Sequence, residues 1–336
     1  MDLTTHYLGL ELAHPVVASA GPLSQTVSGV EGLAQGGASA IVLHSLFEEQ
    51  LRAETHRDQR LLDAQSNVFA EALDYFPTTP ITTRSAAYAY LSLVERSVKA
   101  VDVPVIASLN GADLGGWVEF ARELADAGAA AIELNIYMVP GDVSMPGEVV
   151  ERRHREIVAA VTGAVSVPVA VKLSPSFSSL GHTALDLVEA GASGLVLFNR
   201  FLNPDVDVET LAIDAEFELS TAHEGRVPRT WIAALRNRTT ASLAGTTGVE
   251  SADDVVKYLL AGADVVMTTA ALIRHGRSYS RELVAGLRSW MVRKEFDSLE
   301  QVRGLLAVPT TADGDAERRG GYVSAIQKAK ARYGAL

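Results

Sequence analysis

Short apolar runs alternate with longer amphipathic stretches along most of the chain, and each run ends in polar or small residues. In four places a glycine closes a helical pattern before such a run begins, in GGASAIVLHS, AGAAAIELNI, AGASGLVLFN and AGADVVMTTA, which start at residues 36, 127, 190 and 261. A second pattern, V-x-V-P-V-x-x-x-L, with proline at the start of a strand, occurs in VDVPVIASLNG and VSVPVAVKLSP. The chain therefore repeats a unit of helix and strand.

Amphipathic stretches of helical length separate the apolar runs, most clearly at 114–128 and 251–263, where Ser251 and two acidic residues are typical of a helix start. Near-continuously apolar strands that alternate with helices predict a parallel sheet covered by helices. We expect strands near residues 15–20, 40–45, 103–109, 131–137, 168–174, 194–200, 241–246 and 264–269. Eight such units favour an α/β fold of the (β/α)8 (TIM) barrel type, and an open doubly wound sheet is the alternative.

Three segments fall outside the repeat. Residues 47–84 and 201–228 follow strands, so we expect both to lie over the catalytic face and to set the substrate. We interpret residues 1–293 as the barrel domain and residues 294–336 as a C-terminal helical extension. Within the extension, residues 309–321 are interpreted as a polar linker before a last basic helix.

Composition narrows the classes of function. The formal net charge of −12 argues against nucleic acid and against an anionic membrane as main partners. The sequence contains no cysteine and no zinc-type histidine spacing, so no metal site, disulfide or catalytic thiol is expected. It has neither a signal-like start nor an apolar run of about 20 residues, which indicates a cytoplasmic protein without a membrane helix.

Polar residues gather at the predicted carboxyl ends of the strands, where barrels of this kind carry their active sites. In IELNIYMVPG the apolar pattern breaks just before the strand ends, which predicts that Asn135 and Tyr137 leave the core and enter a site. The candidates at such ends are Ala20, Gly21, His44, Ser45, Asn110, Asn135, Tyr137, Lys172, Asn199, Thr246, Thr247, Gly248, Thr268, Thr269 and Ala270. Solvation of a strand end would explain any single candidate, whereas the whole set favours a site.

Lys172 lies among apolar residues, where a lysine is rare without an anionic partner or a cofactor. Pairing with Glu133 on the neighbouring strand is one interpretation, and a cation that stabilises a charged ring or phosphate is the other. Three interpretations of His44 stay open: a catalytic base, a cofactor contact, or a histidine packed at the end of a strand.

The last two units predict a phosphate site. The segments AGTTGVES and MTTAAL place small residues after strands 7 and 8, where backbone N–H groups and a helix start commonly bind phosphate in this fold. The threonine hydroxyls could add donors, although threonine is also frequent in strands for its β-propensity.

These motifs together resemble the dihydroorotate dehydrogenase family, FMN-dependent enzymes built on a (β/α)8 barrel. The resemblance spans about residues 3–293 and depends on HPVVASAG, ELN at 133–135, VKL at 171–173, Asn199 and GTTGVESADDVVKYLLAGAD at 245–264. It implies that Ala20 and Gly21 line the flavin, that Lys172 lies near its ring, and that Asn135 and Asn199 hold flavin and substrate. The turns at residues 247–248 and 269–270 then bind the FMN phosphate, with Ser45 and Asn110 as further cofactor contacts.

The chain also departs from the family pattern. Family members carry a lysine where this chain has His44, and a Cys or Ser base where it has Tyr137 and Met138. We therefore expect flavin binding but weak or absent turnover of dihydroorotate. Tyr137, His44 and Lys172 are the candidate catalytic residues. An unperturbed phenol, with a pKa of about 10, is a poor base, and imidazole, with a pKa of about 6.5, is better matched.

Three functions stay open. The first is an FMN-dependent oxidoreductase acting on a CH–CH bond of dihydroorotate or a related cyclic substrate, in pyrimidine biosynthesis. The second is a lyase or aldolase that uses Lys172 as an imine-forming nucleophile on a phosphorylated substrate. The third is a non-catalytic flavin-binding protein. A small-molecule substrate is expected, and a homodimer and a separate electron-transfer partner are left open.

Overall fold

Parallel strands close into a barrel in the computed structural model, which describes residues 1–47, 86–111, 117–136, 138, 143–200, 204–214, 218–311 and 314–334. The eight barrel strands of these ranges are β3 (Val16–Ala18), β4 (Ile41–Val42), β6 (Val105–Gly111), β7 (Ala131–Ile136), β8 (Val169–Leu173), β9 (Gly194–Leu197), β12 (Ser242–Gly245) and β13 (Val265–Thr268). Pairing of β13 with β3 and of β4 with β6 closes the ring. The short β5 (Leu46–Phe47) pairs with β6 beyond β4. The (β/α)8 prediction is confirmed, and the strands occur where the sequence predicts them.

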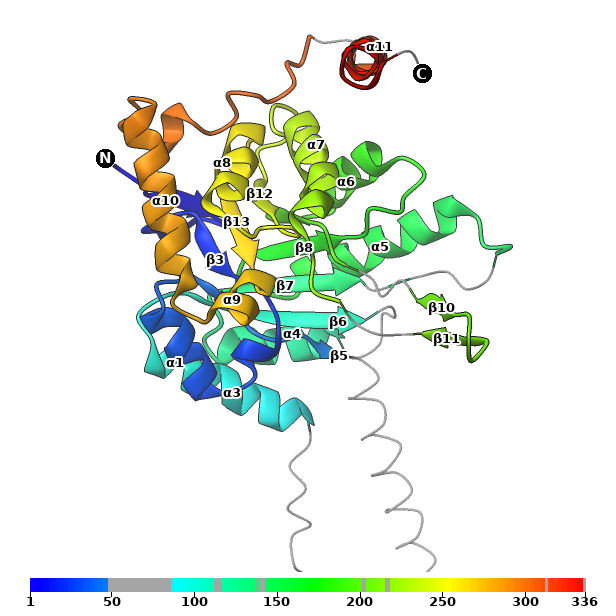
Figure 1. Cartoon of the computed structure of the whole chain (residues 1–336). Coiled ribbons are helices and arrows are strands. Elements are labelled where there is room, and N and C mark those ends of the chain that lie inside the picture. The colour runs from blue at the N-terminus through cyan, green and yellow to red at the C-terminus, as the bar shows by residue number, and fades with distance from the viewer. Residues whose placement is uncertain are drawn as a thin grey trace, which may run out of the picture.

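Helices cover the outside of the barrel (Figure 1). They are α1 (Val27–Gln35), α3 (Ala86–Ala100), α4 (Trp117–Asp126), α5 (Gly147–Thr162), α6 (Leu180–Glu189), α7 (Arg226–Leu235), α8 (Ala252–Ala261) and α10 (Tyr279–Arg293), with the short α9 (Ala270–His275) after β13. The predicted start of α8 is confirmed, because Ser251 caps it and its hydroxyl accepts a hydrogen bond from Asp254 N.

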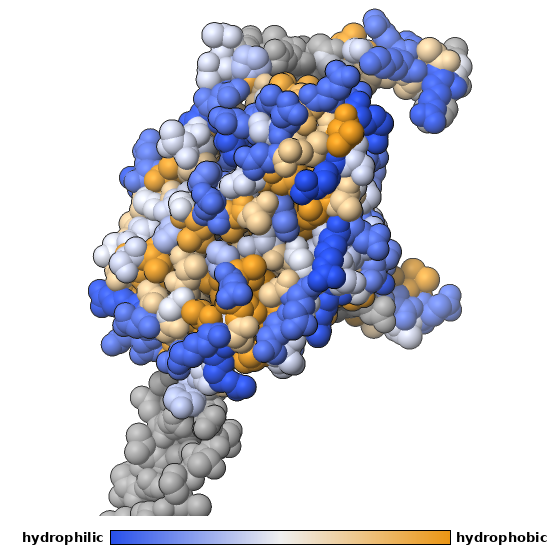
Figure 2. All heavy atoms as spheres, turned by 90° about the vertical axis from the view of Figure 1, so that its left-hand side faces the viewer, coloured by the Kyte–Doolittle hydropathy of each residue, from blue (hydrophilic) through white to orange (hydrophobic). Residues whose placement is uncertain are grey.

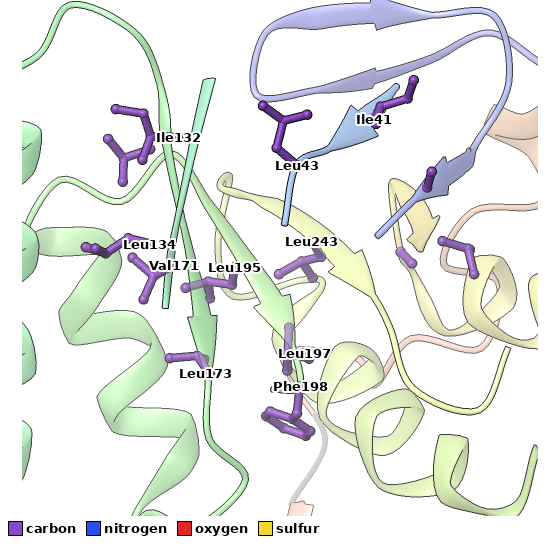
Figure 3. Close-up of a cluster of buried hydrophobic side chains, with 14 of the residues drawn as sticks. Ile41, Leu43, Ile132, Leu134, Val171, Leu173, Leu195, Leu197, Phe198 and Leu243 are labelled. Carbon is purple, nitrogen blue, oxygen red and sulfur yellow. The ribbon is translucent and has the colours of Figure 1, made fainter. Parts of the chain in front are cut away.

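Side chains alternate between the two faces of each strand and so form two hydrophobic cores, one outside and one inside the barrel. Figure 3 shows the outer core, in which Ile132, Leu134 and Val171 come from β7 and β8 and pack in the layer between strands and helices. The inner core fills the barrel with smaller side chains such as Ala131 and Ala170. Alternate residues of a strand face the same side, so Glu133 and Asn135 of β7 point into the barrel as Ala131 does.

An N-terminal hairpin closes the amino end of the barrel, a feature that the sequence analysis missed. Its strands β1 (Thr5–Tyr7) and β2 (Leu10–Leu12) pair antiparallel. Tyr7, Leu8 and Leu12 are buried in the inner core. The Thr5 hydroxyl donates to Asp264 O at 2.8 Å, which ties the hairpin to the start of β13.

The C-terminal extension divides into two parts. Up to residue 308 it lies against the barrel: Leu299 and Val302 are buried, and Val308 N donates to Ala233 O on α7 at 2.8 Å. Helix α11 (Gly314–Tyr333) follows and stands apart from the barrel helices in Figure 1. The predicted linker at 309–321 is wrong from residue 314 onward, because Ala, Glu and Arg in this stretch favour helix over coil. The domain boundary at residue 293 stays a prediction.

The face at the left of Figure 1, which carries α10 and α1, shows groups of apolar side chains between polar ones (Figure 2). Such a mixture is ordinary for a protein surface. In the part of the chain that the structure describes, no helix combines the length and apolar character needed to cross a bilayer.

Candidate functional site

A pocket of about 160 Å³ lies at the carboxyl ends of β8, β9, β12, β13 and β3. Leu219 and Ser220, from the segment after β9, form part of its wall, so the prediction that residues 201–228 reach the catalytic face is confirmed for this part. The other predicted loop, 47–84, lies outside the described residues except for Phe47. The pocket brings together predicted residues from five strand ends: Ala20, Lys172, Asn199, Thr246, Thr247, Gly248, Thr268, Thr269 and Ala270.

The turn after β12 is shaped by a buried tyrosine of α8. The Tyr258 hydroxyl lies 2.7 Å from both Thr246 O and Thr247 O and donates to these carbonyls. In a trans peptide the carbonyl and the following N–H point in opposite directions, so the N–H groups of Thr247 and Gly248 are turned away from Tyr258. Gly248 N donates to Ser220 Oγ, a pocket residue, at 3.3 Å. The turn therefore directs the Gly248 N–H toward the pocket wall, which is the orientation that binding of an anion there requires.

Glycine is needed at two places next to this turn. Gly248 has φ of +68°, and an added Cβ would lie 2.5 Å from Thr221 O. At Gly245 an added Cβ would lie 2.3 Å from the Tyr258 ring, so the absence of a side chain there admits the tyrosine. Burial raises the pKa of the Tyr258 phenol far above its usual range, which keeps it a hydrogen-bond donor.

Of the four threonine hydroxyls that the sequence analysis considers as phosphate donors, those of Thr268 and Thr269 are bonded within the chain, and a role toward phosphate stays a prediction for all four. Thr268 donates to Val249 O at 3.0 Å, and Thr269 donates to Ser19 O at 3.0 Å. These bonds link β13 to its two neighbours. These two hydroxyls thus hold the strand ends together.

The wall residues Leu219 and Ser220, and Glu218 just before them, are each held from a different direction. Arg200 donates to Glu218 O and, through Nε, to Glu224 Oε2 at 2.8 Å. Arg274 of α9 donates to Leu219 O at 3.1 Å. Since Ser220 accepts from Gly248, the wall is joined to β9, β12 and α9. Tyr258, Arg274 and Ser220 were missed by the sequence analysis, because they lie off the strand ends.

Lys172 forms a buried ion pair with Glu133. The Nζ atom lies 3.2 Å from Glu133 Oε1, and the lysine and glutamate side chains are 9% and 1% exposed. Glu133 Oε2 is buried and has no hydrogen-bond partner among the described residues. The pairing interpretation of Lys172 is therefore confirmed, while the same lysine also lines the pocket.

Asn135 belongs to a hydrogen-bonded group inside the barrel mouth. Its Nδ2 donates to Ser108 Oγ at 3.1 Å and lies 3.3 Å from Ser45 Oγ, and the two serine hydroxyls are 2.8 Å apart. Asn110, Asn135 and Lys172 lie in one row across β6, β7 and β8. Asn135 Oδ1 is buried and lacks a partner within the described ranges. The mouth thus offers unused acceptors next to a cation.

His44 lies apart from this group. Its ring makes an edge-to-face contact with Tyr90 of α3, with centroids 5.1 Å apart. Burial lowers the pKa of His44, and a hydrogen bond with the Ser24 backbone partly offsets this. Ser45, the next residue, takes the place facing the barrel interior. The Nδ1 atom of His44 is buried and has no hydrogen-bond partner among the described residues. The ring contact with Tyr90 favours a packed strand-end histidine, and a role as base or cofactor contact stays a prediction.

The remaining candidates are Gly21 and Tyr137. An added Cβ at Gly21 would lie 2.7 Å from Thr269 Oγ1, so this glycine lets the ends of β3 and β13 approach each other. Tyr137 lies outside the described residues. Across the ranges that the structure describes, no cluster of three or more His, Asp or Glu residues could hold a metal ion.

The polar atoms of the site indicate whether it fits FMN. Unpartnered buried acceptors on Glu133 and Asn135, the Lys172 ammonium and the N–H groups at residues 247–248 offer complements to a polar ring and to an anion. The residues therefore fit a phosphorylated cofactor with a polar ring system. Fold and site together define a (β/α)8-barrel protein with its site at the carboxyl ends of the strands.

The chain belongs to the dihydroorotate dehydrogenase family, whose family model matches residues 2–291. It is 25% identical over 317 residues to the catalytic subunit of dihydroorotate dehydrogenase B (NAD(+)) of Thermoplasma acidophilum, over 90% of this chain and 98% of the relative. The corresponding subunit of Methanothermobacter thermautotrophicus is 27% identical over 318 residues, with the same coverage of both chains. The NAD-dependent dihydropyrimidine dehydrogenase subunit PreA of Escherichia coli is 25% identical over 223 residues, 61% of this chain and 53% of that protein.

Membership of this family confirms the predicted cofactor and reaction class. Members are FMN-dependent flavoproteins and oxidoreductases, so the chain is an oxidoreductase of the dihydroorotate and dihydropyrimidine dehydrogenase kind. The lyase hypothesis for Lys172 is set aside by this finding.

Proposed function

We propose that the chain acts on a ring CH–CH bond of dihydroorotate or a closely related cyclic amide, in pyrimidine metabolism. The observation that carries the proposal is the pair of buried acceptors, Glu133 Oε2 and Asn135 Oδ1, which have no donors among the described residues. A cyclic amide places N–H donors beside carbonyl acceptors, which matches acceptors that lie next to the Lys172 ammonium.

The chain's own residues bind and orient in this proposal. Backbone N–H groups at residues 247–248 and 269–270 would hold the FMN phosphate, and Ala20 and Asn199, which line the pocket, would contact the flavin together with Gly21. Lys172 supplies a positive charge whose position is fixed by Glu133. The transfer of hydride is the chemistry that FMN supplies when bound.

A residue of the chain must also accept a proton from the substrate carbon. Tyr137 and His44 stay hypotheses for this base, and the contacts of His44 with Tyr90 and Ser24 favour Tyr137. We expect the anaerobic rate of flavin bleaching by substrate to fall at least tenfold in Tyr137→Phe and to change little in His44→Ala. Equal rates in Tyr137→Phe and the parent would remove Tyr137 from the role.

The proposal is tested by adding dihydroorotate and dihydrouracil separately, without oxygen, to the purified protein. Loss of the flavin absorbance bands with either compound supports the substrate class, and the faster compound identifies the ring substituent that the site accepts. We expect slow bleaching by dihydroorotate. A protein that carries FMN but is bleached by neither compound would overturn the substrate proposal and leave the cofactor assignment standing.

We also propose a separate electron-transfer partner. Support comes from two kinds of relative that are named as subunits, the catalytic subunit of dihydroorotate dehydrogenase B and PreA. NAD+ alone should then fail to reoxidise the reduced protein at a useful rate. Rapid direct reoxidation by NAD+ would argue against the partner.

A further inference from the structure

Two segments expose apolar side chains and carry opposite charges. One is the hairpin of β10 (Asp205–Asp207) and β11 (Ala212–Asp214), which lies beyond the carboxyl ends of the barrel strands in Figure 1. The other is helix α11. We propose that the hairpin of one copy of this chain binds α11 of a second copy.

The hairpin is an apolar surface with an acidic border. Its apolar side chains, which are 64–87% exposed, are Val206, Val208, Leu211 and Ile213. Val206 and Ile213 lie opposite each other across the strand pair. From residue 204 to residue 214 the sequence has four acidic residues and no basic one. An isolated two-stranded sheet is marginally stable in water, so this hairpin gains stability when its apolar face is covered.

Helix α11 has the complementary character. Tyr322, Ile326 and Ala329 follow one another at helical spacing and form a stripe. Tyr322 and Ile326 are exposed, and every side chain described from 321 to 332 is exposed except that of Ala329, which is half-buried. The charged residues of the last turns are all basic, Lys328, Lys330 and Arg332, and the last two flank the stripe on either side. An isolated helix with three glycines gains most of its stability from packing, so a partner is expected for the stripe.

Charge complementarity selects α11 as the occupant. The chain as a whole has a net charge of −12, whereas α11 contains five basic and two acidic residues. A partner surface for the hairpin needs apolar groups bordered by cations, and α11 combines Tyr322 and Ile326 with Lys330 and Arg332 on its two sides. If each copy offers both segments, the two contacts are related by a two-fold axis and close a dimer. Salt should weaken the dimer, since its charged borders are exposed to solvent.

The experiment uses two charge-reversed full-length proteins. The first carries Lys328→Glu, Lys330→Glu and Arg332→Glu, and the second carries Asp205→Lys and Glu209→Lys, which spare the turn acceptor Asp207. Sedimentation velocity should show a dimer for the parent and at least a tenfold higher dissociation constant for each variant alone. A 1:1 mixture of the two variants should form dimers again, because each reversed segment then meets its complement on the other chain.

The control reverses exposed cations elsewhere, with Arg96→Glu, Lys99→Glu and Arg293→Glu, and should dimerise like the parent. Circular dichroism should confirm that all variants are folded. Three results would overturn the proposal. The parent could be monomeric at every concentration, or each variant could dimerise like the parent. The third result is a 1:1 mixture of the variants that does not dimerise, while a single protein carrying both reversals does. The last result would mean that α11 binds the hairpin of its own chain.

Discussion

The hydroxyl of Tyr258 is the side-chain group that determines which way the turn after β12 faces. We expect Tyr258→Phe to weaken FMN retention at least several-fold, because the carbonyls of Thr246 and Thr247 lose their shared donor and the turn can relax. Two buried acceptors without a donor should also lower the free energy of unfolding by about 1–3 kcal/mol. Flavin content after dialysis and denaturant unfolding measure the two effects.

Tyr279→Phe is the matched control for this change. Its hydroxyl also donates to a backbone carbonyl, Glu250 O at 3.2 Å, but not to the turn. Flavin retention in this control should equal that of the parent. Equal retention in Tyr258→Phe would show that the turn keeps its shape, or binds no phosphate, without the hydroxyl.

The contributions of Glu133 and Lys172 to the free energy of unfolding should depend on each other, because the two side chains form a buried ion pair. Replacing Glu133 by glutamine keeps the shape but leaves the buried ammonium without its carboxylate, which should lower the free energy of unfolding by about 3–5 kcal/mol. Adding Lys172→Met to that variant should recover part of the loss. A double-mutant cycle by urea unfolding measures the coupling, and strictly additive losses would contradict it.

The inward polar residues could be predicted from the sequence, and the contacts that give them roles could not. Lys172 and Asn135 stand out because they interrupt apolar strands. The orientation of His44 was hidden, because β4 ends at Val42 and the chain then leaves strand geometry, so alternation no longer indicates the facing side. Ser45 faces the barrel in its place.

At the level of elements, a charge introduced into the turn between β13 and α9 tests whether this turn binds the phosphate. Ala270 lines the pocket at the first position of α9. Ala270→Glu should abolish FMN retention, since a carboxylate would lie where the phosphate is proposed, whereas a carboxylate in a first helical turn does not disfavour folding. Ala270→Gln, of similar size and neutral, should retain more flavin. Equal retention in both variants would place the phosphate elsewhere.

Strands and helices could be predicted because their apolar periods are local. The shape of the proposed phosphate turn depends instead on Tyr258, twelve residues beyond Thr246. Gly245 and Tyr258 belong to successive elements, and only the fold shows that the tyrosine ring fills the space above the glycine. The N-terminal hairpin was missed for a similar reason. Its strands are three residues each, too short for a period, and they are stabilised by burial at the barrel end.

For the whole molecule, one buried and two half-buried histidines make stability depend on pH. Burial lowers the pKa of His14, His44 and His154 below the value of about 6.5 expected in the unfolded chain. At acid pH the unfolded state therefore binds more protons than the folded state. The stability that these groups contribute is fully present above about pH 6.5 and is lost as the pH falls through that value and through the folded-state pKa.

Urea unfolding between pH 7.5 and pH 5 should thus show a falling free energy of unfolding, with each histidine contributing at most about 1.4 kcal/mol per pH unit. His154 is the best single probe, because its ring is buried against Phe177 and bonded to Val150 O at 2.8 Å. His154→Gln should flatten the pH dependence, while the same change at the exposed His182 should leave the slope as in the parent. A slope that is unchanged in His154→Gln would mean that this ring gains its proton without opposing the fold.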